Sequence, residues 1–304
     1  MKSLRETLKR NKLAVFFYNK FIDYKANRYY KKIVRENKIK VLSIAETIEE
    51  IVKNNCSIVR FGDGELSLIQ GKSIPFEEYD KKLSDRLGEV LKSQEENMLV
   101  GIPNIFNGLE IYTKKDQIFW KRNLMESYDI WCKYLNRDTY ANAFITRPYM
   151  SLKDKNKSRG YFKSLLKLFV GREVVLIEGE FSRLGCGNDL FQQTAKVERV
   201  LCPAKHAFSK YSEILAVAKK QPKDKLILLS LGPTAKLLAL DLHKLGYQVL
   251  DIGHIDLEYE WYLRGVKEKV TIDNKFVNEV EEGDKNLQDT FDEKYEREII
   301  AKVL

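Results

Sequence analysis

Two acidic residues two positions apart, Asp63 and Glu65, lie in the heptapeptide RFGDGEL, which follows a short apolar stretch. Carboxylates suit Mg²⁺ and Mn²⁺, which often bind through one or two protein carboxylates together with a substrate diphosphate. Gly62 and Gly64 make the backbone around the acids permissive, and Arg60 stands where it could face an anion. The pattern indicates a cation site beside an anionic ligand, with an acidic surface turn as the alternative.

A second polar segment, EGEFSRLGCGNDLF, follows the apolar run VVLIE. Glycines let backbone N–H groups approach a ligand closely, and an arginine can bind phosphate oxygens in bidentate fashion. The amide and carboxylate near its end could contact a ribose or a base. We expect a nucleotide-binding loop here, whereas a structural connection would use its acids to cap the next helix. The candidates are Glu180, Ser182, Arg183, Asn188 and Asp189.

A third candidate lies in LSLGPTAKLLALDL, where an apolar run passes directly into a helix. Gly232 and Thr234 stand at the start of that helix, and a helix N-terminus is suited to binding an anion. The segment matches neither a P-loop nor a GxGxxG motif. An ordinary capped strand–helix turn is the alternative.

A fourth candidate lies in DIGHIDLEYEWY, where His254 stands near Asp256 and Glu258. A neutral imidazole here could bind a metal ion, and any of the three side chains could act as a general base. A structural histidine is the alternative. A weaker fifth candidate is Arg147 in ITRPYM, which could hold a phosphate or pair with an acid.

These motifs are separated by amphipathic helices and apolar strands in alternation. Helices are predicted over 43–54, 78–94, 114–135, 158–170, 207–221 and 234–246, the first with Ser43 and Glu46 as a capping box. Strands are predicted over 56–61, 97–102, 140–145, 172–179, 196–203, 225–233 and 247–253. The alternation indicates an α/β fold with a mostly parallel, doubly wound sheet and helices on both faces. Ligands of such sheets bind outside the carboxyl ends of the strands, and residues 62–65 are expected to form a loop there.

Composition and charge narrow the function further. The 304 residues carry a net charge of +9, but residues 1–40 alone hold 13 Lys/Arg and 3 Asp/Glu. The remainder is therefore close to neutral, which argues against a nucleic-acid-binding surface on the folded body. The four cysteines show no CxxC pairing, which favours reduced thiols over a disulfide framework or a zinc site. Without an apolar run long enough for a membrane span or a signal-peptide core, the chain is expected to be cytoplasmic.

The chain is expected to comprise three parts: a basic aromatic helical arm over 1–40, a catalytic domain over 41–266, and a polar tail with a C-terminal helix over 267–304. In the arm, Phe17, Phe21, Tyr24 and Arg28 follow helical steps. This stripe would pack on the body or on a partner protein, or it would rest on an anionic membrane surface at the inner face of the cell membrane.

The motifs RFGDGE, SRLGCGNDLF, LGPTAKLLALDL and DIGHIDLEYEWY, in this order, resemble the GT-D-fold glycosyltransferases, also known as the DUF1792 domain. The resemblance covers roughly residues 41–266. It implies a Rossmann-like domain, a nucleotide-sugar donor such as a UDP-hexose, a divalent cation and a D-x-E motif that serves both. It also implies a glycan, glycoprotein or lipid-linked acceptor, in the glycosylation of bacterial surface adhesins or in polysaccharide synthesis.

On this sequence the D-x-E motif falls on Asp63 and Glu65, which would hold Mn²⁺ or Mg²⁺ together with His254. The donor would be bound by Arg60, Gly62, Glu180, Ser182, Arg183, Asn188, Asp189, Gly232 and Thr234, with the two arginines facing its diphosphate. Asp256, Glu258 or His254 would supply a base, and the choice among them is open. Two other functions fit the same residues: a metal-dependent nucleotide phosphohydrolase, and a non-catalytic scaffold in a membrane-associated glycan assembly complex.

Overall fold

The computed structural model describes residues 12–277, 279–280, 283, 287 and 292–304. Its described strands form one nine-stranded sheet in the order β1-β4-β3-β2-β8-β7-β5-β6-β9, and all the paired strands are parallel. The strands are β1 (Lys40–Val41), β2 (Ser57–Arg60), β3 (Met98–Ile102), β4 (Thr139–Asn142), β5 (Glu173–Gly179), β6 (Lys196–Cys202), β7 (Leu226–Ser230), β8 (Val249–Asp251) and β9 (Ile299–Lys302). The predicted parallel α/β sheet is confirmed.

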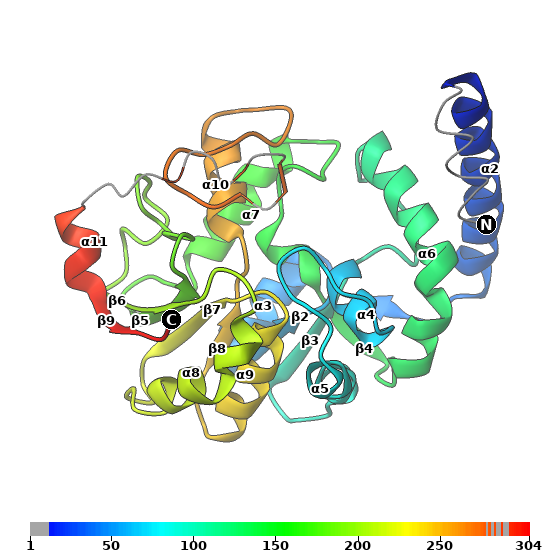
Figure 1. Ribbon diagram of the computed structural model, residues 1–304. Helices are drawn as coiled ribbons and strands as arrows, with labels where there is room; N and C mark the ends of the chain where they lie inside the picture. Colours follow the sequence, from blue (N-terminus) through cyan, green and yellow to red (C-terminus); the bar gives the residue numbers. More distant parts are fainter. Residues whose placement is uncertain (1–11, 278, 281–282, 284–286, 288–291) are drawn as a thin grey trace.

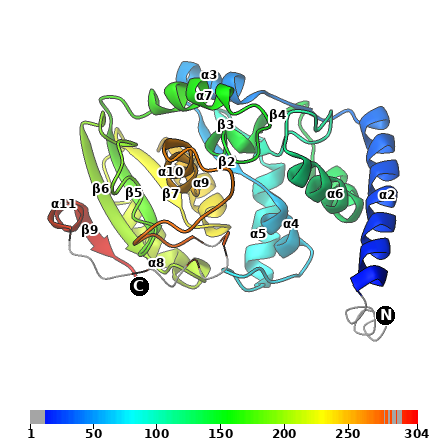
Figure 2. The same cartoon turned by 90° about the horizontal axis from the view of Figure 1, so that it is seen from above.

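Helices cover both faces of this sheet, as Figure 2 shows. Helices α5, α8 and α9 lie along one face, and α3 and α7 lie on the other. The described helices are α2 (Lys12–Glu36), α3 (Ile44–Asn54), α4 (Asp63–Ile69), α5 (Lys81–Lys92), α6 (Lys114–Tyr134), α7 (Asn156–Leu166), α8 (Tyr211–Ala218), α9 (Thr234–Lys244), α10 (Ile255–Leu263) and α11 (Glu293–Glu298), with 3₁₀ turns η1 (Ala143–Thr146) and η2 (Ala207–Lys210).

The strand order reverses at the centre of the sheet, between β2 and β8. From β2 the chain moves outward through β3 to β4, and after β5 and β6 it returns through β7 to β8, beside β2. In open parallel sheets a ligand crevice forms at such a reversal, outside the carboxyl ends of the strands. The motifs at residues 60–65, 230–236 and 251–258 therefore meet at one place, although the sequence separates them widely.

Local sequence explains most of the elements. Strand β7 (LILLS) is buried along its whole length, as expected of a parallel strand with helices on both sides. Helix α3 begins with the predicted capping box, in which Ser43 and Glu46 satisfy each other's backbone N–H groups. Helix α10 was not among the expected helices, because seven of its nine residues are buried and no polar face marks its period.

The prediction that residues 62–65 form a loop is wrong. Gly62 is the N-cap of helix α4, and Asp63 is its first residue. Glu65 reaches back to accept a hydrogen bond from the Gly62 N–H at 2.8 Å, which completes one half of a capping box. An acid at the third helical position is a helix-start signal, and it explains why the turn continues as a helix.

The predicted C-terminal helix is confirmed only in part. Helix α11 covers 293–298, and residues 299–302 form strand β9 instead of extending the helix. Strand β9 pairs with β6 at the edge of the sheet, where its residues alternate between half-buried and exposed. Ladder hydrogen bonds to an otherwise unpaired edge favour a strand over a last helical turn.

Residues 1–11 of the predicted N-terminal arm lie outside the described residues, and the arm from Lys12 to Glu36 is helix α2, which packs along α6 at one end of the molecule (Figure 1). The residues that it buries against the body, Ala26, Tyr30 and Ile33, lie in its second half. The Tyr30 hydroxyl donates to the carbonyl of Ile105 at 2.9 Å, and Asp23 pairs with Arg122 of α6 at 2.7 Å. No helix in the described part of the chain has the length and apolar character needed to cross a bilayer.

Candidate functional site

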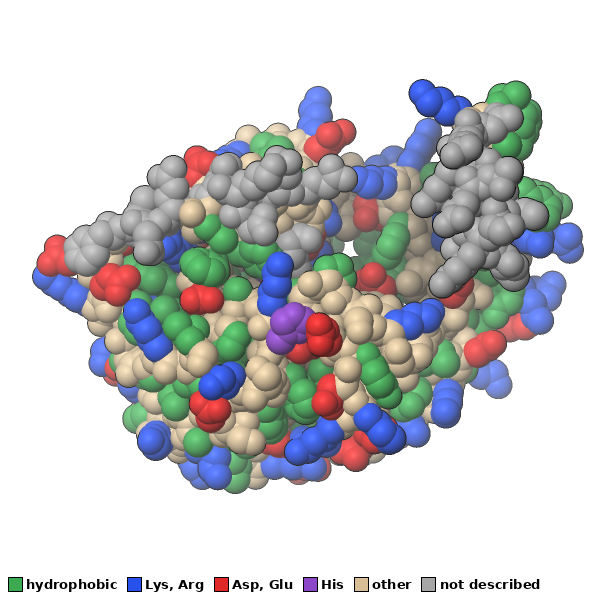
Figure 3. All heavy atoms as spheres, in the orientation of Figure 1, with side chains coloured by type: hydrophobic (Ala, Val, Ile, Leu, Met, Phe, Trp, Pro, Cys, Tyr) green, Lys and Arg blue, Asp and Glu red, His purple; other side chains and the backbone are tan. Residues whose placement is uncertain are grey.

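A cavity of about 540 Å³ opens at the carboxyl ends of the central strands. Strands β2, β7 and β8 supply Arg60, Ser230 and Asp251 to its lining, and the start of α6 supplies the wall that includes Trp120. Figure 3 shows the surface hollowed between the body of the molecule and the side formed by α6 and α2. The volume lies in the range of pockets that bind small ligands and cofactors.

The two acids of the D-x-E motif both line this cavity but have different surroundings. Residues two apart on a helix do not share a face, so Asp63 and Glu65 diverge. Glu65 is buried and receives two bonds, one from the Gly62 N–H and one from the Lys236 ammonium at 2.9 Å. Asp63 makes no ion pair with a described residue and stays exposed to the cavity. The protein that surrounds the cavity partly desolvates the Asp63 carboxyl and so raises its pKa, and the neighbouring Glu65 carboxylate raises it further.

A buried ion cluster lies beneath these acids. Asp251 receives Lys236 at 3.1 Å and Arg60 at 3.2 Å, and the Arg60 Nε also donates to the Asp251 carbonyl at 2.6 Å. A further bond from the Arg60 guanidinium to the carbonyl of Ala143 at 3.2 Å fixes its orientation. Burial alone would raise the pKa of Asp251, but Lys236 and Arg60 outweigh this and hold it below its usual value. The cluster ties β2, β8 and α9 together at the cavity wall.

A second ion cluster crosses the cavity from the other side. Arg147, which follows η1, pairs with Glu279 at 2.7 Å, and Lys269 pairs with the same carboxylate. Burial would raise the pKa of Glu279, but Arg147 and Lys269 hold it well below its usual range. The weak fifth candidate, Arg147, therefore lines the cavity, and its guanidinium is bound to an acid that an anionic ligand could replace.

His254, at the start of α10, lines the same cavity. Burial, together with nearby Arg147 and Arg60, lowers its pKa to about 4 against the opposing effect of Glu279. The imidazole is therefore neutral at pH 7 and could bind a cation. A general base works best with a pKa near the operating pH, so this shift argues against that role for His254.

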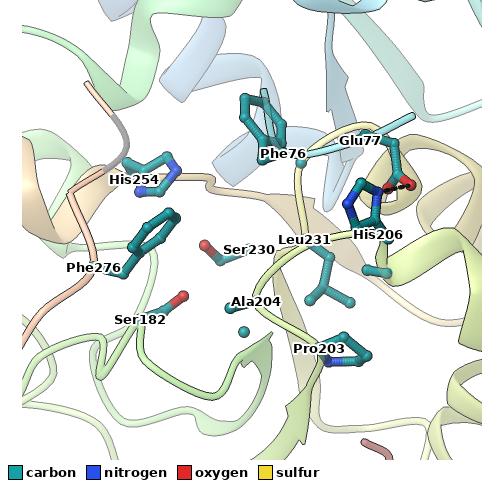
Figure 4. Close-up of a pocket in the computed structure, with 13 residues that line it drawn as sticks. Phe76, Glu77, Ser182, Pro203, Ala204, His206, Ser230, Leu231, His254 and Phe276 are labelled. Carbon is teal, nitrogen blue, oxygen red and sulfur yellow. Dashed lines mark ion pairs between the residues drawn. The ribbon is translucent and has the colours of Figure 1, made fainter. Parts of the chain in front are cut away.

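A smaller hollow of about 40 Å³ adjoins the cavity and shares Phe76, Ser230, Gly232 and His254 with it. Figure 4 shows His254, Phe276 and Ser182 on one side of it, with Phe76 and Leu231 on the other. Gly232 has a φ of +51°, and a Cβ there would lie 2.8 Å from the Phe76 ring. Only glycine satisfies both conditions, which gives a structural reason for a glycine at this position.

The acids predicted as bases after His254 lie outside both hollows. Asp256 is fully buried and accepts bonds from the Gly185 N–H at 2.8 Å, the Asn188 amide at 2.7 Å and the Lys275 ammonium at 2.6 Å. Glu258 is buried and accepts bonds from the backbone N–H groups of residues 149 and 150. Burial raises the pKa of Glu258. Both environments are those of carboxylates that hold loops in place.

The glycine-rich segment 180–190 contributes fewer residues to the site than expected. Ser182 lines the smaller hollow, whereas Asn188 is bound to Asp256 and Glu260. Asp189 accepts a hydrogen bond from the Tyr259 hydroxyl at 2.8 Å. Arg183 adopts a left-handed backbone conformation and stacks near the ring of Tyr295. Among these residues, only Ser182 lies where a ligand in the described hollows would touch it.

Two further residues that were predicted to bind the nucleotide-sugar donor also lie outside the lining of both hollows. Glu180 is half-buried in the turn after β5, and its N–H donates to the carbonyl of Cys202 at 2.9 Å. Thr234 is fully buried, and its hydroxyl donates to Glu77 at 3.2 Å. Arg60, Gly62 and Gly232, by contrast, do line the cavity.

Several lining residues were not among the predicted ones, notably Lys236, Asp251 and Glu279. One signal was present in the sequence: Lys236 stands in the otherwise apolar helical run TAKLLAL, where a lysine is buried only if it is paired. Asp251 carried a weaker signal, as an acid at the end of an apolar strand. No local pattern in the sequence indicates that Glu279, in a polar segment, lines the cavity.

The fit of a divalent cation can be judged from the charges in the cavity. Five acids and five bases line it: Asp63, Glu65, Asp116, Asp251 and Glu279, and Arg60, Lys115, Arg147, Lys236 and Lys269. Four of the bases already pair with acids, so a diphosphate would bring uncompensated negative charge. The described residues contain no group of three or more metal-ligating side chains. A divalent cation bound here would therefore have to take one or two protein ligands and complete its shell from a diphosphate.

Comparisons with known proteins agree with this geometry. A model of the family described as glycosyltransferase GT-D fold matches residues 58–280. A solved structure, described as domain of unknown function 1792 with a distinct glycosyltransferase fold, is 39% identical with a TM-score of 0.86, over 92% of this chain and 99% of that one. A new DUF1792 glycosyltransferase from Streptococcus sanguinis is 38% identical with a TM-score of 0.85, over 88% and 100%.

Curated relatives are similar over most of this chain. The probable glycosyl transferase Gly of Streptococcus gordonii is 39% identical over 269 residues, which are 88% of this chain and 39% of the relative. Glycosyltransferase GlyD of Streptococcus pneumoniae serotype 4 is 36% identical over 267 residues, 88% of this chain and 33% of the relative. The chain thus spans one third to two fifths of the length of these relatives. By its family match, its fold and these relatives, the chain belongs to the GT-D-fold glycosyltransferases.

Proposed function

We propose that this chain is a metal-dependent glycosyltransferase that transfers a hexose from a nucleotide sugar, with a UDP-hexose as the expected donor. The observation that carries the proposal is the cavity at the strand reversal, where Asp63 is exposed between two ion clusters. Its position is where open α/β sheets bind nucleotides. Family membership supplies the reaction class, and the residues of the cavity supply the means to bind a diphosphate.

In glycosyl transfer, the bond between the sugar and the diphosphate breaks, and negative charge develops on the leaving phosphate. Positive side chains fixed around that phosphate stabilise the charge without having to reorganise. Arg147 is placed for this role because it borders the cavity and is oriented by Glu279. Arg60 and Lys236 are held more rigidly by Asp251, so they would act mainly through their positive charge at the cavity floor.

We propose Asp63 as the main protein ligand of a divalent cation, with the neutral imidazole of His254 as a second ligand. When bound, Mn²⁺ or Mg²⁺ would neutralise charge on the diphosphate as a Lewis acid. Glu65 would act mainly by holding the start of α4 and the Lys236 ammonium, since both its oxygens are already bonded. In the D-x-E motif, Asp63 would thus bind the cation, and Glu65 would position the residues around it.

The nucleoside would extend from the cavity toward the smaller hollow between Phe76 and Phe276. An aromatic ring on each side suits a flat base, and Ser182 and Ser230 offer hydroxyl groups beside it. The acceptor would be a glycan, a glycoprotein or a lipid-linked saccharide in the building of bacterial surface polysaccharide or glycosylated adhesins. We expect the reaction to take place in the cytoplasm.

The test is titration of UDP into the full chain by calorimetry, with Mn²⁺ and with chelator, followed by a screen of UDP-hexoses for turnover. We expect UDP to bind at least tenfold more tightly with Mn²⁺, and a sugar to be transferred when an acceptor glycan is present. Metal-independent binding of equal strength would overturn the metal assignment. Release of inorganic phosphate without any sugar transfer would indicate a phosphohydrolase instead.

A further inference from the structure

The outward face of helix α2 changes character halfway along its length. Its first three turns present Leu13, Phe17, Phe21 and Tyr24, with exposed fractions of 64%, 62%, 53% and 60%. These positions are spaced by three or four residues and so form one stripe along the helix. A contiguous row of large, exposed apolar side chains marks a surface that interacts with a protein or a membrane.

The same stripe continues into bases in the second half of the helix. Arg28, Lys31 and Arg35 follow at the same helical spacing, with Lys32 beside them, and all four are exposed. The two acids of α2 are already occupied, since Asp23 pairs with Arg122 of α6 and Glu36 pairs with Arg35. The outward face is therefore apolar in its first half and strongly cationic in its second.

The body of the protein holds this helix from the opposite side. The buried residues Ala26, Tyr30 and Ile33 anchor its second half, and Lys121 of α6 donates to Asn27 at 2.9 Å. In Figure 3, apolar and cationic side chains border the edge of the molecule where α2 lies. The fold thus fixes the bases close to the body and leaves the aromatic half at its margin.

From this face we propose that α2 docks the protein on an anionic lipid surface, with Leu13, Phe17, Phe21 and Tyr24 inserted among the lipids and the basic half at the phosphates. Aromatic and aliphatic side chains enter the headgroup boundary, and each nearby lysine or arginine adds attraction to anionic lipids. Lys20 and Lys25 lie over the rings of Phe16 and Phe21, where they can reach headgroups while the rings are inserted.

A second copy of the chain fits this face less well. Parallel pairing of two α2 helices would bring Arg28, Lys31 and Arg35 against the same residues of the other copy. Antiparallel pairing would set those bases against Leu13 and Phe17. In the first arrangement like charges repel each other, and in the second charged side chains face apolar ones. A lipid surface, by contrast, offers phosphate and hydrocarbon side by side.

The experiment is co-sedimentation of the full chain with vesicles of phosphatidylcholine alone or with 30% phosphatidylglycerol. We expect at least tenfold tighter binding to the anionic vesicles, weakened by salt. Phe17→Ser/Phe21→Ser should lower that binding at least tenfold, and Arg28→Gln/Lys31→Gln should lower it by about fivefold for each base removed. Matched controls are Val52→Ser/Val170→Ser and Lys219→Gln/Lys220→Gln, which alter exposed apolar and basic residues elsewhere and should bind as the wild type does.

Circular dichroism and the melting temperature show whether each variant is folded. We expect all the variants to fold, because the substituted side chains are exposed. The orientation is tested by Phe17→Trp and Lys31→Trp in vesicles with brominated acyl chains, where only the first should be strongly quenched. Equal binding to neutral vesicles, unchanged binding of the α2 variants, or no binding at all would overturn the proposal. So would a stable dimer that Phe17→Ser/Phe21→Ser dissociates while vesicle binding is absent. UDP titration of the same variants should be unchanged, which separates this test from that of the catalytic site.

Discussion

Separate replacement of Asp63 and Glu65 should divide the D-x-E motif into two functions. Asp63 is exposed to the cavity and makes no ion pair with a described residue. Glu65 forms a buried ion pair with Lys236 and accepts a hydrogen bond from the Gly62 N–H. Asp63→Asn and Glu65→Gln each remove one negative charge and keep the shape of the side chain. We expect the first to impair metal-linked ligand binding and the second to impair stability.

The cost of Glu65→Gln follows from its bonds. The glutamine can still accept from the Gly62 N–H, but its bond with the Lys236 ammonium loses the charge of the carboxylate. A hydrogen bond to a charged group contributes about 1.5–3 kcal/mol. Lys236 keeps its second partner, Asp251, so we expect a loss of about 2 kcal/mol rather than the larger cost of a stranded buried charge. For a chain of 304 residues, that is a fall in melting temperature of roughly 3 °C.

Asp63→Asn should leave stability almost unchanged. The raised pKa of Asp63 shows that its surroundings disfavour the charged form, so removal of the charge costs the fold little. If Asp63 binds the cation, affinity for UDP in the presence of Mn²⁺ should fall at least tenfold, or about 1.4 kcal/mol. Affinity measured with chelator should stay as in the wild type.

Calorimetric titration of UDP with and without Mn²⁺, together with thermal unfolding, measures both quantities on each variant. The opposite pattern would refute the reasoning: Glu65→Gln losing metal-dependent binding at an unchanged melting temperature, while Asp63→Asn binds normally. That result would mean that Glu65 breaks its ion pair with Lys236 and binds the metal ion itself.

Three further outcomes are expected. Asp251→Asn should destabilise the chain by about 3–5 kcal/mol at neutral pH, because it leaves the buried Arg60 without its carboxylate partner, although Lys236 keeps Glu65. Since the folded-state pKa of Asp251 is lowered, its contribution is complete above about pH 4 and is lost as the pH falls through that pKa, so acid unfolding of the variant should be less steep. Gly232→Ala should lower both the melting temperature and UDP affinity, because its Cβ would press on Phe76; an unchanged affinity would separate this ring from the donor site. Tyr295→Phe should keep or raise stability by up to about 1 kcal/mol in chemical denaturation, since its buried hydroxyl has no hydrogen-bond partner among the described residues.

Much of the fold could be predicted because it follows from local patterns. The continuous apolar runs of β5 and β7 and the capping box at Ser43 each depend on residues close in sequence. Prediction failed where tertiary contact overrides the local pattern. Helix α10 is buried on nearly all sides, and strand β9 forms because β6 offers an unpaired edge. The division of the chain at residues 40 and 266 stays a prediction.

The candidate site was predictable as a place but not as a set of contacts. The carboxyl ends of parallel strands converge in any such sheet, so Arg60, Asp63, Gly232 and His254 could be expected to meet. Which side chain faces the cavity depends on pairing across long separations. Asp256, for example, has the residue type of a base but is occupied by three donors from two distant segments.

The sequence alone therefore determined the residue types, the alternation of elements and the position of the chemistry at the strand ends, because these depend on neighbours within a turn or a strand. Only the tertiary structure decided that Glu65 is bound to Lys236 while Asp63 stays exposed to the cavity. It also placed Glu279 against Arg147, across 132 residues of chain. The physical reason is that burial and ion pairing depend on surroundings assembled from distant segments, and the free energy of a charged group is set by those surroundings.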